Sequence, residues 1–306
     1  MRTLTVIAIL GCLLFASFYG TESGSAEKPI AGKDELPGPI IEKVSFQNVA
    51  IKDNFWRPKI ELNRMAGIRR ALQQCSRSIE NFDIAAGKKQ GKHELYCAGH
   101  LIEAAAAYYE ATGKRKLLDA AIRLADHIDS VFGPDKRLEA PGHEEIELAL
   151  FKLYKVTHDR KYLNLSAFFV DERGDPKRMI VDKITPPDRD PNANTPQRWR
   201  PPSYMQDHIP VTKQFYAVGH AVRATYLYTA MADISMETRD SKYLPALDSI
   251  WNDIVGKKLY ITGGIGTRQF HDEGFGSAYL LPNDQAYCET CSSIGFTFWN
   301  SRMNLL

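Results

Sequence analysis

The sequence predicts an all-α protein whose helical hairpins stack into an (α/α) toroid. The first observation is a Gly-His pair followed by an apolar, helix-like stretch that ends near a tyrosine, and it occurs three times. The second is the polar turn and the Lys-(Tyr/Leu)-Leu triplet that follow each stretch. A helical hairpin buries its apolar faces only by packing against its neighbours, so repeated hairpins are expected to lie side by side.

The three copies follow one another with irregular spacing, because insertions fall between them. They begin at Gly99-His100, Gly142-His143 and Gly219-His220, and turn at Thr112-Gly113, Thr157-His158-Asp159 and Thr238-Arg239-Asp240. Each Gly-His pair is expected to open its first helix. The equivalent ends of the hairpins should then meet, which predicts that His100, His143 and His220 converge at one mouth of the ring.

Further elements follow from local patterns. Apolar residues at three- and four-residue steps predict a helix from Pro58 to about Ser78, and a last helix is expected over Ile294–Leu305. The segment Asp171–Tyr204 is rich in Pro, Asp and Arg and is expected to be a long loop that shapes a binding site. The glycines of Ile261–Gly266 predict a turn whose backbone closely approaches that site.

Composition and the N-terminus limit the class of protein. The chain has 306 residues, 44% of them hydrophobic and 25% charged, with a net charge of +2 and no basic run, which makes nucleic acid an unexpected partner. Residues 1–26 have a basic start, an apolar run and small residues, which is typical of a secretory signal peptide. We therefore expect a secreted or periplasmic protein with no membrane segment after signal removal. Residues 27–45 are expected to form a linker or arm, and residues 46–306 a partial toroid domain.

Four cysteines remain after the predicted signal peptide: Cys75, Cys97, Cys288 and Cys291. Four in a chain of this length do not form a disulfide scaffold, although export would permit disulfides. On spacing alone, the Cys288/Cys291 pair fits a redox pair, a strained disulfide or part of a metal site equally well.

Candidate chemistry gathers near the end of the chain. Glu289 and Cys291 are metal-ligand types two positions apart, and Glu273 is a further carboxylate. A zinc site generally takes four thiolate, imidazole or carboxylate donors, and a glycoside-cleaving site needs a protonated carboxyl beside a nucleophile or base. About half of each requirement is visible here.

Other candidates have an equally good structural explanation. His208, before Pro210, is either a substrate contact or a turn residue held by Asp207. Glu144, Glu145 and Glu147 are interpreted as acidic residues favourable at a helix start. Trp56, Trp199 and Tyr204 could stack on a sugar ring, but packing roles are the default interpretation for each.

Seven motifs in order resemble one known family. They are Phe55-Trp56-Arg57-Pro58, His93–His100, Pro141-Gly142-His143, Gln206–Val211, Gly219–Ala224, Leu259–Gly266 and Ala286–Cys291. Together they resemble glycoside hydrolase family 127, whose characterised members are β-L-arabinofuranosidases. The likeness runs from about residue 45 to the last residue. It implies an (α/α)-toroid catalytic domain followed by β-sandwich domains, and a retaining hydrolase that uses a zinc-bound cysteine thiolate as nucleophile.

The resemblance also implies roles for particular residues. Glu273 resembles the general acid/base, and Glu289 and Cys291 resemble two of the zinc ligands. His100, His143 and His220, and less securely His208, resemble substrate-contacting residues. The implied substrate is an oligosaccharide or glycan with L-arabinofuranose at its non-reducing end.

The nucleophile of the family lies in a Cys-Cys dipeptide, and these 306 residues contain none. Because a thiolate must attack while Glu273 protonates the leaving oxygen, we expect this polypeptide to be the N-terminal part of such an enzyme and inactive alone. Two alternatives remain open. One is a carbohydrate-binding remnant without catalysis, and the other is a different (α/α)-toroid carbohydrate-active enzyme.

Overall fold

The computed structural model describes residues 48–67, 94–175, 179–180, 201–267 and 273–306, and the chain forms two compact units, Met1–Lys88 and Lys89–Leu306. The predicted signal peptide and the arm up to residue 45 lie outside the described residues. In the first unit, α2 (Trp56–Leu62) follows Asp53, whose side chain accepts a hydrogen bond of 2.8 Å from the backbone N–H of Phe55. The π-helical turn η2 (Asn63–Gly67) continues it, and the rest of the helix predicted to Ser78 lies outside the described part.

The second unit is built from helices, as predicted. Its helices are α4 (Glu94–Thr112), α5 (Lys116–Val131), α6 (Ile146–Thr157), α7 (Arg160–Glu172), α8 (Ala221–Thr238), α9 (Leu244–Lys257) and α10 (Thr290–Met303). Short 3-10 turns are η3 (Pro202–Met205), η4 (Val211–Lys213) and η5 (Ser241–Tyr243). The described strands, β1 (Glu139–Ala140) and β2 (Met179–Ile180), form one parallel pair.

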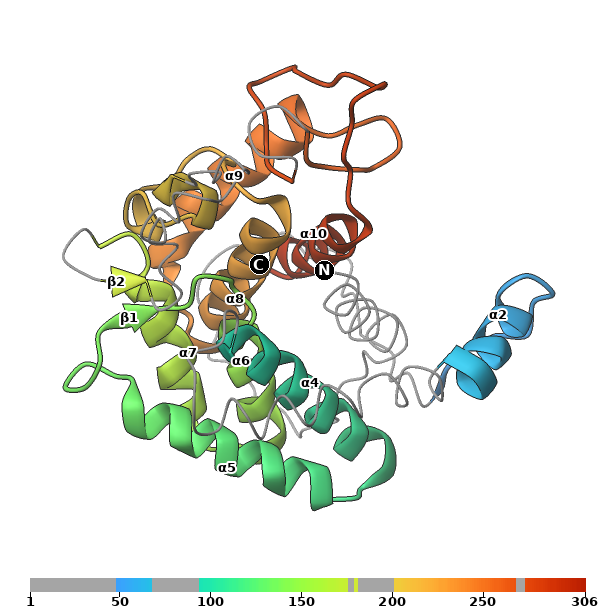
Figure 1. Ribbon diagram of the computed structural model, residues 1–306, viewed down its shortest axis with the longest axis vertical. Coiled ribbons are helices and arrows are strands. Elements are labelled where there is room, and N and C mark those ends of the chain that lie inside the picture. The colour runs from blue at the N-terminus through green and yellow to red at the C-terminus, as the bar shows by residue number, and fades with distance from the viewer. Residues whose placement is uncertain (1–47, 68–93, 176–178, 181–200, 268–272) are drawn as a thin grey trace, which may run out of the picture. The chain divides into compact units, whose positions relative to one another are not determined.

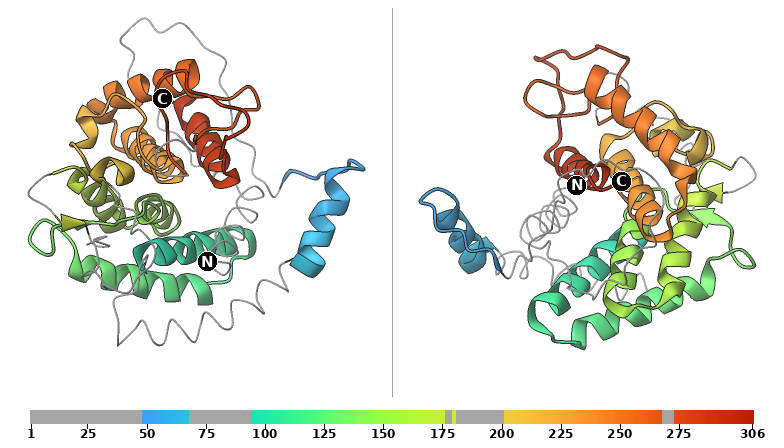
Figure 2. Two further views of the ribbon diagram at one scale, coloured as in Figure 1. Left: turned by 45° about the horizontal axis from the view of Figure 1, so that its top comes forward. Right: turned by 180° about the vertical axis from the view of Figure 1, so that it is seen from behind.

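The hairpins form two rows. Successive contacts join α4 to α6, α6 to α8 and α8 to α10, while α5, α7 and α9 pack on the outside of this row (Figure 1). Both views of Figure 2 keep α4 beside α5 within one hairpin. Inner and outer helices in this order are the arrangement of an (α/α) toroid, so the predicted fold class is confirmed.

The inner helix α8 and the outer helix α5 differ in how they are buried. Every residue of α8 from Ala221 to Ser235 is buried, because this helix touches α6, α7, α9 and α10. The outer helix α5 buries one stripe only, formed by Leu118, Ala121, Ala125 and Ile128. This three- and four-residue spacing is that of a helix with one apolar face.

The three polar turns share one geometry. Thr112, Thr157 and Thr238 end the first helices, and each hydroxyl donates to the carbonyl four residues earlier at 2.6, 2.8 and 2.7 Å. The next residues, Gly113, His158 and Arg239, have φ of 68°, 58° and 56°. The left-handed conformation ends each helix and reverses the chain.

The Lys-Tyr part of the triplet fastens one hairpin to the previous one. Lys161 Nζ lies 2.8 Å from Asp126 of α5, and the Tyr162 hydroxyl donates to the same carboxylate at 2.7 Å. In the next hairpin, Lys242 and Tyr243 hold Asp171 of α7 in the same way, at 2.8 and 2.6 Å. The triplet is therefore a connector between outer helices.

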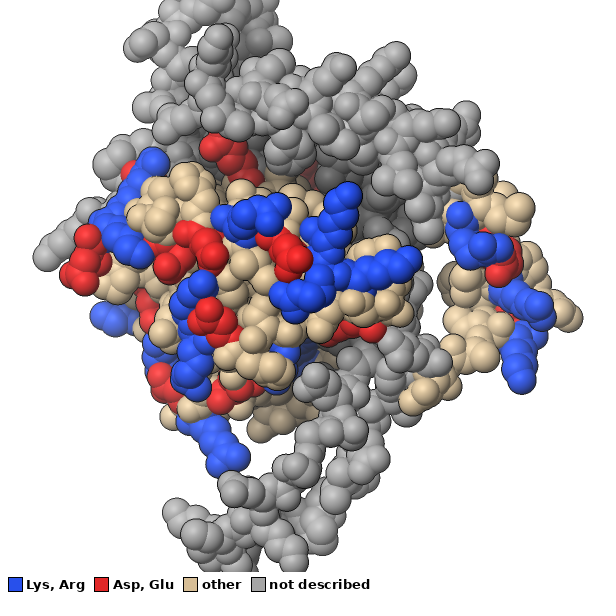
Figure 3. Space-filling model, turned by 90° about the horizontal axis from the view of Figure 1, so that it is seen from below, with Lys and Arg blue, Asp and Glu red and all other residues tan. Residues whose placement is uncertain are grey.

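The outer face carries charges of both signs. Figure 3 shows Lys and Arg intermingled with Asp and Glu over the described part of the face seen from below. Examples are the Arg115–Asp119 pair at 3.1 Å and the Lys161–Asp126 pair. Among the helices that the structure describes, none is both long enough and apolar enough to span a bilayer.

Candidate active site

The Gly-His pairs occupy three different positions relative to their helices. His220 is the N-cap of α8, and its Nδ1 accepts a hydrogen bond of 3.2 Å from the backbone N–H of Arg223. His143 lies before α6, and its Nδ1 donates to the carbonyl of Glu144 at 2.8 Å. The prediction that His100 opens its helix is wrong, because α4 already runs from Glu94 and places His100 in its second turn.

The three histidines nevertheless lie in one chain of rings. The Tyr96 ring lies 4.4 Å from His100 and 4.3 Å from His143, measured between centroids. His143 lies 5.5 Å from His220, which lies 5.4 Å from Tyr204. The structure thus brings together the three residues expected at one mouth, and their contact with substrate stays a prediction.

Glu273 lies at the end of this chain. Its Oε2 accepts a hydrogen bond of 2.5 Å from the Tyr204 hydroxyl and lies 3.2 Å from Nε2 of His220. Because Nδ1 of His220 already accepts from a backbone N–H, the neutral ring carries its proton on Nε2 and donates it to Glu273. Two donors therefore hold one oxygen of the predicted acid/base.

Backbone contacts bring the segments of this site together. The Glu273 carbonyl accepts from the N–H of Ala221 at 3.0 Å, and the Tyr204 carbonyl accepts from the N–H of His220 at 3.0 Å. Gly219 has φ of 70°, and a Cβ there would lie 2.1 Å from the carbonyl oxygen of Ser203. Only glycine allows the backbone at this position to lie so close to that of Ser203, which explains the glycine of this Gly-His pair.

The two predicted zinc ligands lie at the start of α10, beside Glu273. Glu289 is the N-cap residue and Cys291 belongs to the first turn. Burial raises the pKa of the Glu289 carboxyl, the neighbouring Glu273 charge raises it further, and a hydrogen bond with the Cys291 thiol opposes both effects. The structure therefore groups three residues that the sequence singled out.

The donor set at this position fits part of a zinc site. Oε2 of Glu289 is buried and has no hydrogen-bond partner within the described residues. A buried carboxylate oxygen needs a partner, and a bound metal ion would provide one. A carboxylate oxygen and a thiol are both zinc donors. Two donors are half of the usual four, so these residues fit the metal without completing its site.

Cys288 belongs to the glycine loop instead. Its backbone N–H donates to the Gly266 carbonyl at 3.2 Å, and a Cβ on Gly264 would lie 3.0 Å from its Sγ. Burial raises the pKa of the Cys288 thiol, which disfavours the thiolate that a nucleophile needs. Cys288 and Cys291 are both free, so the structure holds no disulfide here.

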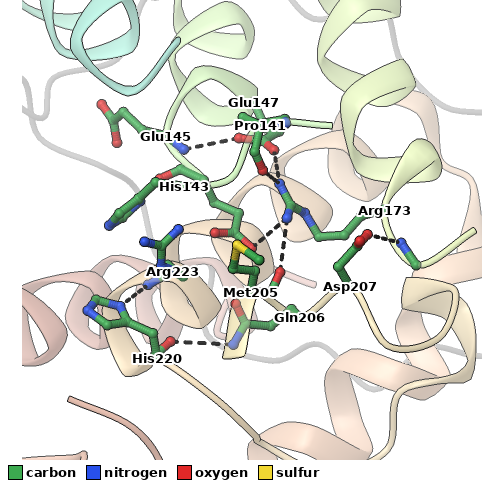
Figure 4. Close-up of polar contacts among 12 residues, drawn as sticks. Pro141, His143, Glu145, Glu147, Arg173, Met205, Gln206, Asp207, His220 and Arg223 are labelled. Carbon is green, nitrogen blue, oxygen red and sulfur yellow. Dashed lines mark hydrogen bonds and ion pairs between the residues drawn. The ribbon is translucent and has the colours of Figure 1, made fainter. Parts of the chain in front are cut away.

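The acidic residues lie at the start of α6, as the sequence indicated, with Glu145 as the N-cap residue and Glu147 in the first turn. Glu144, Glu145 and Glu147 are all buried. Arg173 at the end of α7 lies 3.2 Å from Glu147 Oε1 (Figure 4) and 3.1 Å from Glu144 Oε1. Burial raises the pKa of Glu144 to about 7, although Arg173 and Arg223 lower it.

Arg173 also joins the two loops that carry site residues. Its guanidinium donates to the carbonyls of Pro141 at 2.7 Å and Met205 at 2.9 Å (Figure 4). The first carbonyl is two residues before His143, and the second follows Tyr204. A single buried cation therefore fixes both loops.

A second polar group surrounds His100. Ligand-type atoms of His100, Glu103 and Glu145 lie within 4.8 Å of one another, and Nδ1 of His100 is 3.1 Å from Oε1 of Glu145. Burial lowers the pKa of His100 to about 4, so the ring is neutral at pH 7. Lys152 is ion-paired with Glu103, so this group already contains a cation and does not resemble a vacant metal site.

The other residues singled out by the sequence are His208, Tyr204, Trp199 and Trp56. The His208 side chain is exposed, and its contact with substrate stays a prediction. Tyr204 is buried and holds Glu273, which the sequence gave no local reason to expect. Trp199 lies outside the described residues, and Trp56 belongs to the first unit.

Comparison with known proteins places these residues in a family. The family model for the GH127 catalytic domain of β-L-arabinofuranosidases matches residues 73–306. A curated relative, the non-reducing end β-L-arabinofuranosidase of Bifidobacterium longum subsp. longum, is 38% identical over 216 residues. The alignment covers 70% of this chain and 32% of that protein.

Solved structures agree with this comparison. A GH127 β-L-arabinofuranosidase from Geobacillus stearothermophilus T6 is 45% identical, with a TM-score of 0.63 over 71% of this chain and 34% of that one. A second GH127 β-arabinofuranosidase is also 45% identical, with a TM-score of 0.60 over 72% of this chain and 32% of that one. The chain thus spans about a third of the length of these relatives. On the match to its catalytic-domain model, the chain belongs to the GH127 β-L-arabinofuranosidase family.

Proposed function

We propose that this chain supplies the acid/base half of a retaining β-L-arabinofuranosidase that acts on L-arabinofuranose at the non-reducing end of a glycan. One observation carries the proposal. Glu273 is held by Tyr204 and His220, and its charge acts on Glu289, which is hydrogen-bonded to Cys291. A retaining hydrolase of this kind needs a carboxyl that acts as acid and base, and it needs thiol groups nearby.

Glu273 performs the proton transfers in this proposal. It donates a proton to the glycosidic oxygen as the bond to the sugar breaks, and it removes a proton from water when the sugar is released. His143 and His220 line the approach to this carboxyl and are assigned to sugar binding. An imidazole also offers an apolar ring surface, and this is the contact expected of His220, because both of its nitrogens already have partners.

Glu289 and Cys291 would hold zinc in this enzyme. When bound, the metal supplies positive charge that lowers the pKa of a coordinated thiol. These 306 residues contain no Cys-Cys dipeptide. We therefore propose that the polypeptide of this length binds zinc weakly and does not turn over substrate.

The proposed cellular location follows from residues 1–26. A signal peptide would export the protein to the periplasm or the medium, where plant-type glycans are encountered. N-terminal sequencing of the mature protein tests this part. A mature chain that begins after about residue 26 supports export, and an intact Met1 contradicts it.

Release of L-arabinose tests the function. The assay compares the 306-residue polypeptide with the product of the complete gene on p-nitrophenyl β-L-arabinofuranoside. We expect release by the complete product and none by the 306-residue polypeptide. Release by the polypeptide would overturn its proposed inactivity, and no release by either would overturn the hydrolase proposal.

Sugar binding separates the hydrolase from a carbohydrate-binding remnant. Glu273→Gln keeps the size of the side chain but removes its acid/base function. Loss of turnover with unchanged sugar affinity is expected of the hydrolase. Sugar binding by a complete gene product that never releases arabinose would favour the binding remnant.

A further inference from the structure

The tyrosine and histidine around Glu273 serve a purpose beyond packing. We propose that Tyr204 and His220 are positioning residues that hold Oε2 of Glu273 and direct proton exchange to its other oxygen, Oε1. The proposal rests on the assignment of Glu273 as acid/base and deepens it. Tyr204 and His220 need not touch the sugar for this role.

Two hydrogen-bond donors meet at Oε2 of Glu273. A carboxylate oxygen has two lone pairs in its plane. The Tyr204 hydroxyl, at 2.5 Å, and Nε2 of His220, at 3.2 Å, both donate to Oε2. Because two donors use both lone pairs, a proton added to Glu273 goes to Oε1.

The position of His220 as the N-cap of α8 fixes which of its ring nitrogens carries the proton. Nδ1 of His220 accepts from the backbone N–H of Arg223 at 3.2 Å, so a helix terminus fixes which ring nitrogen is unprotonated. The Nε2–H can then donate to Glu273 but cannot accept its proton. His220 therefore orients the acid/base without competing for the proton that the leaving oxygen must receive.

Packing fixes Tyr204 in the same way. Its side chain is buried, with the Arg223 guanidinium 5.3 Å from its ring centroid and the His220 ring 5.4 Å away. Gly219 lets the backbone of this segment approach, and the Tyr204 carbonyl accepts from the N–H of His220. The two donors therefore come from one rigid junction, which keeps them at a fixed angle to each other.

Two substitutions and one control test the proposal. Tyr204→Phe removes only the hydroxyl. His220→Asn removes the Nε2–H but keeps a side-chain acceptor suited to an N-cap. The matched control is Tyr154→Phe, because the Tyr154 hydroxyl also donates to a carboxylate, that of Glu237 at 2.6 Å, at the far ends of α6 and α8.

The first readout is NMR on the 306-residue chain, and it does not depend on activity. With ¹⁵N-labelled histidine, we expect the signals lost in His220→Asn to be those of a neutral Nε2–H ring. With ¹³C-labelled glutamate carboxyls, Tyr204→Phe and His220→Asn should each shift the signal that Glu273→Gln removes. Tyr154→Phe should leave that signal in place and shift the signal of Glu237.

The second readout is leaving-group dependence in the complete gene product. A poor alcohol leaving group needs its proton from the acid, whereas p-nitrophenolate leaves with little help. Tyr204→Phe should lower kcat for an alkyl β-L-arabinofuranoside by roughly 100-fold, with a much smaller loss for the p-nitrophenyl sugar and little change in KM. A role in packing alone would lower both rates equally.

The outcomes separate this proposal from the function on which it rests. An Nδ1–H tautomer of His220, or a Glu273 signal unmoved by Tyr204→Phe, overturns the positioning role whatever the enzyme does. Equal losses on both substrates overturn it as well. Correct NMR signals in a gene product without arabinofuranosidase activity would leave the geometry standing and overturn the proposed function instead.

Discussion

The two ends of the helical hairpins are built by different rules. At the turn end, each helix stops in the same way, with a threonine hydroxyl bonded to the preceding turn and a left-handed residue after it. Charged contacts there, such as Lys161–Asp126, are partly exposed. At the site end, the polar groups are buried and no two hairpins use their histidine alike.

The difference shows what repetition in a sequence encodes. Equivalent turns need equivalent residues, because the same backbone reversal recurs in each hairpin. The site end needs unlike residues, because a sugar and an acid/base are asymmetric and each histidine meets a different partner. The repeat is therefore a guide to the fold, and the departures from it are a guide to the chemistry.

Removing a buried cation at the site end should have the largest effect on stability. Arg173→Met leaves Glu144 and Glu147 buried without their partner, which should lower the free energy of unfolding by about 3–5 kcal/mol. Lys161→Met is the control at the turn end, where an exposed pair should cost less than about 1 kcal/mol. Urea denaturation measures both, and equal losses would remove the contrast between the two ends.

Replacement of Gly113 at the turn end and of Gly219 at the site end by alanine compares two glycines of similar φ. At Gly113 an added Cβ meets nothing within 4 Å, so alanine should cost about 1 kcal/mol from the left-handed conformation alone. At Gly219 the same Cβ collides with backbone, and the cost should rise to roughly 2–4 kcal/mol. Thermal melts of the two variants check this order, and a smaller loss at Gly219 would contradict the close approach.

The neutral His100 gives the site end its own pH dependence. Its pKa is about 4 in the folded chain against 6.5 as the ordinary value, so the unfolded chain binds this proton more readily. Protonation of this group therefore destabilises the fold progressively as the pH falls from 6.5 to about 4. The free energy of unfolding should be lower by about 2 kcal/mol at pH 5 than at pH 7. The difference in unfolding free energy between wild type and His100→Gln, measured across this range, isolates the effect. No change in that difference between pH 7 and pH 5 would show that His100 is not held neutral.

Metal removal should have the smallest effect on this polypeptide. Glu289 and Cys291 supply two donors, so zinc should be held too weakly to stabilise the fold. Dialysis against EDTA should leave the melting temperature unchanged. A clear fall in the melting temperature, absent in Cys291→Ser, would show that the described residues hold zinc more tightly than two donors allow.

Much of the fold could be predicted from the sequence because its signals are local. The threonine turns, the Lys-Tyr connector and the apolar spacing of α5 depend on neighbouring residues. The prediction for His100 was wrong because its Gly-His pair lies inside α4, whereas the other two pairs lie before α6 and α8. The Gly-His pair was instead interpreted as a helix start.

The site was only partly predictable because its partners are remote in sequence. Glu273, Glu289 and Cys291 stand out by residue type and spacing, and the structure places them together. Tyr204 and Glu273 are 69 residues apart, and no local pattern connects them. Likewise, Glu144 and Glu147 were correctly interpreted as helix-start charges, but their buried pairing with Arg173 was missed because Arg173 lies at the far end of the next helix.

The most direct test of the account is the response of the histidine side chains to sugar. The 306-residue chain, labelled with ¹⁵N-histidine, is titrated with methyl β-L-arabinofuranoside and, as a control, with methyl β-D-xylopyranoside. We predict that the signals of His143 and His220 shift with the arabinofuranoside alone, while that of the exposed His208 does not. Unmoved signals for both residues at saturating sugar, or equal shifts with both sugars, would contradict the claim that the buried end of these hairpins recognises L-arabinofuranose.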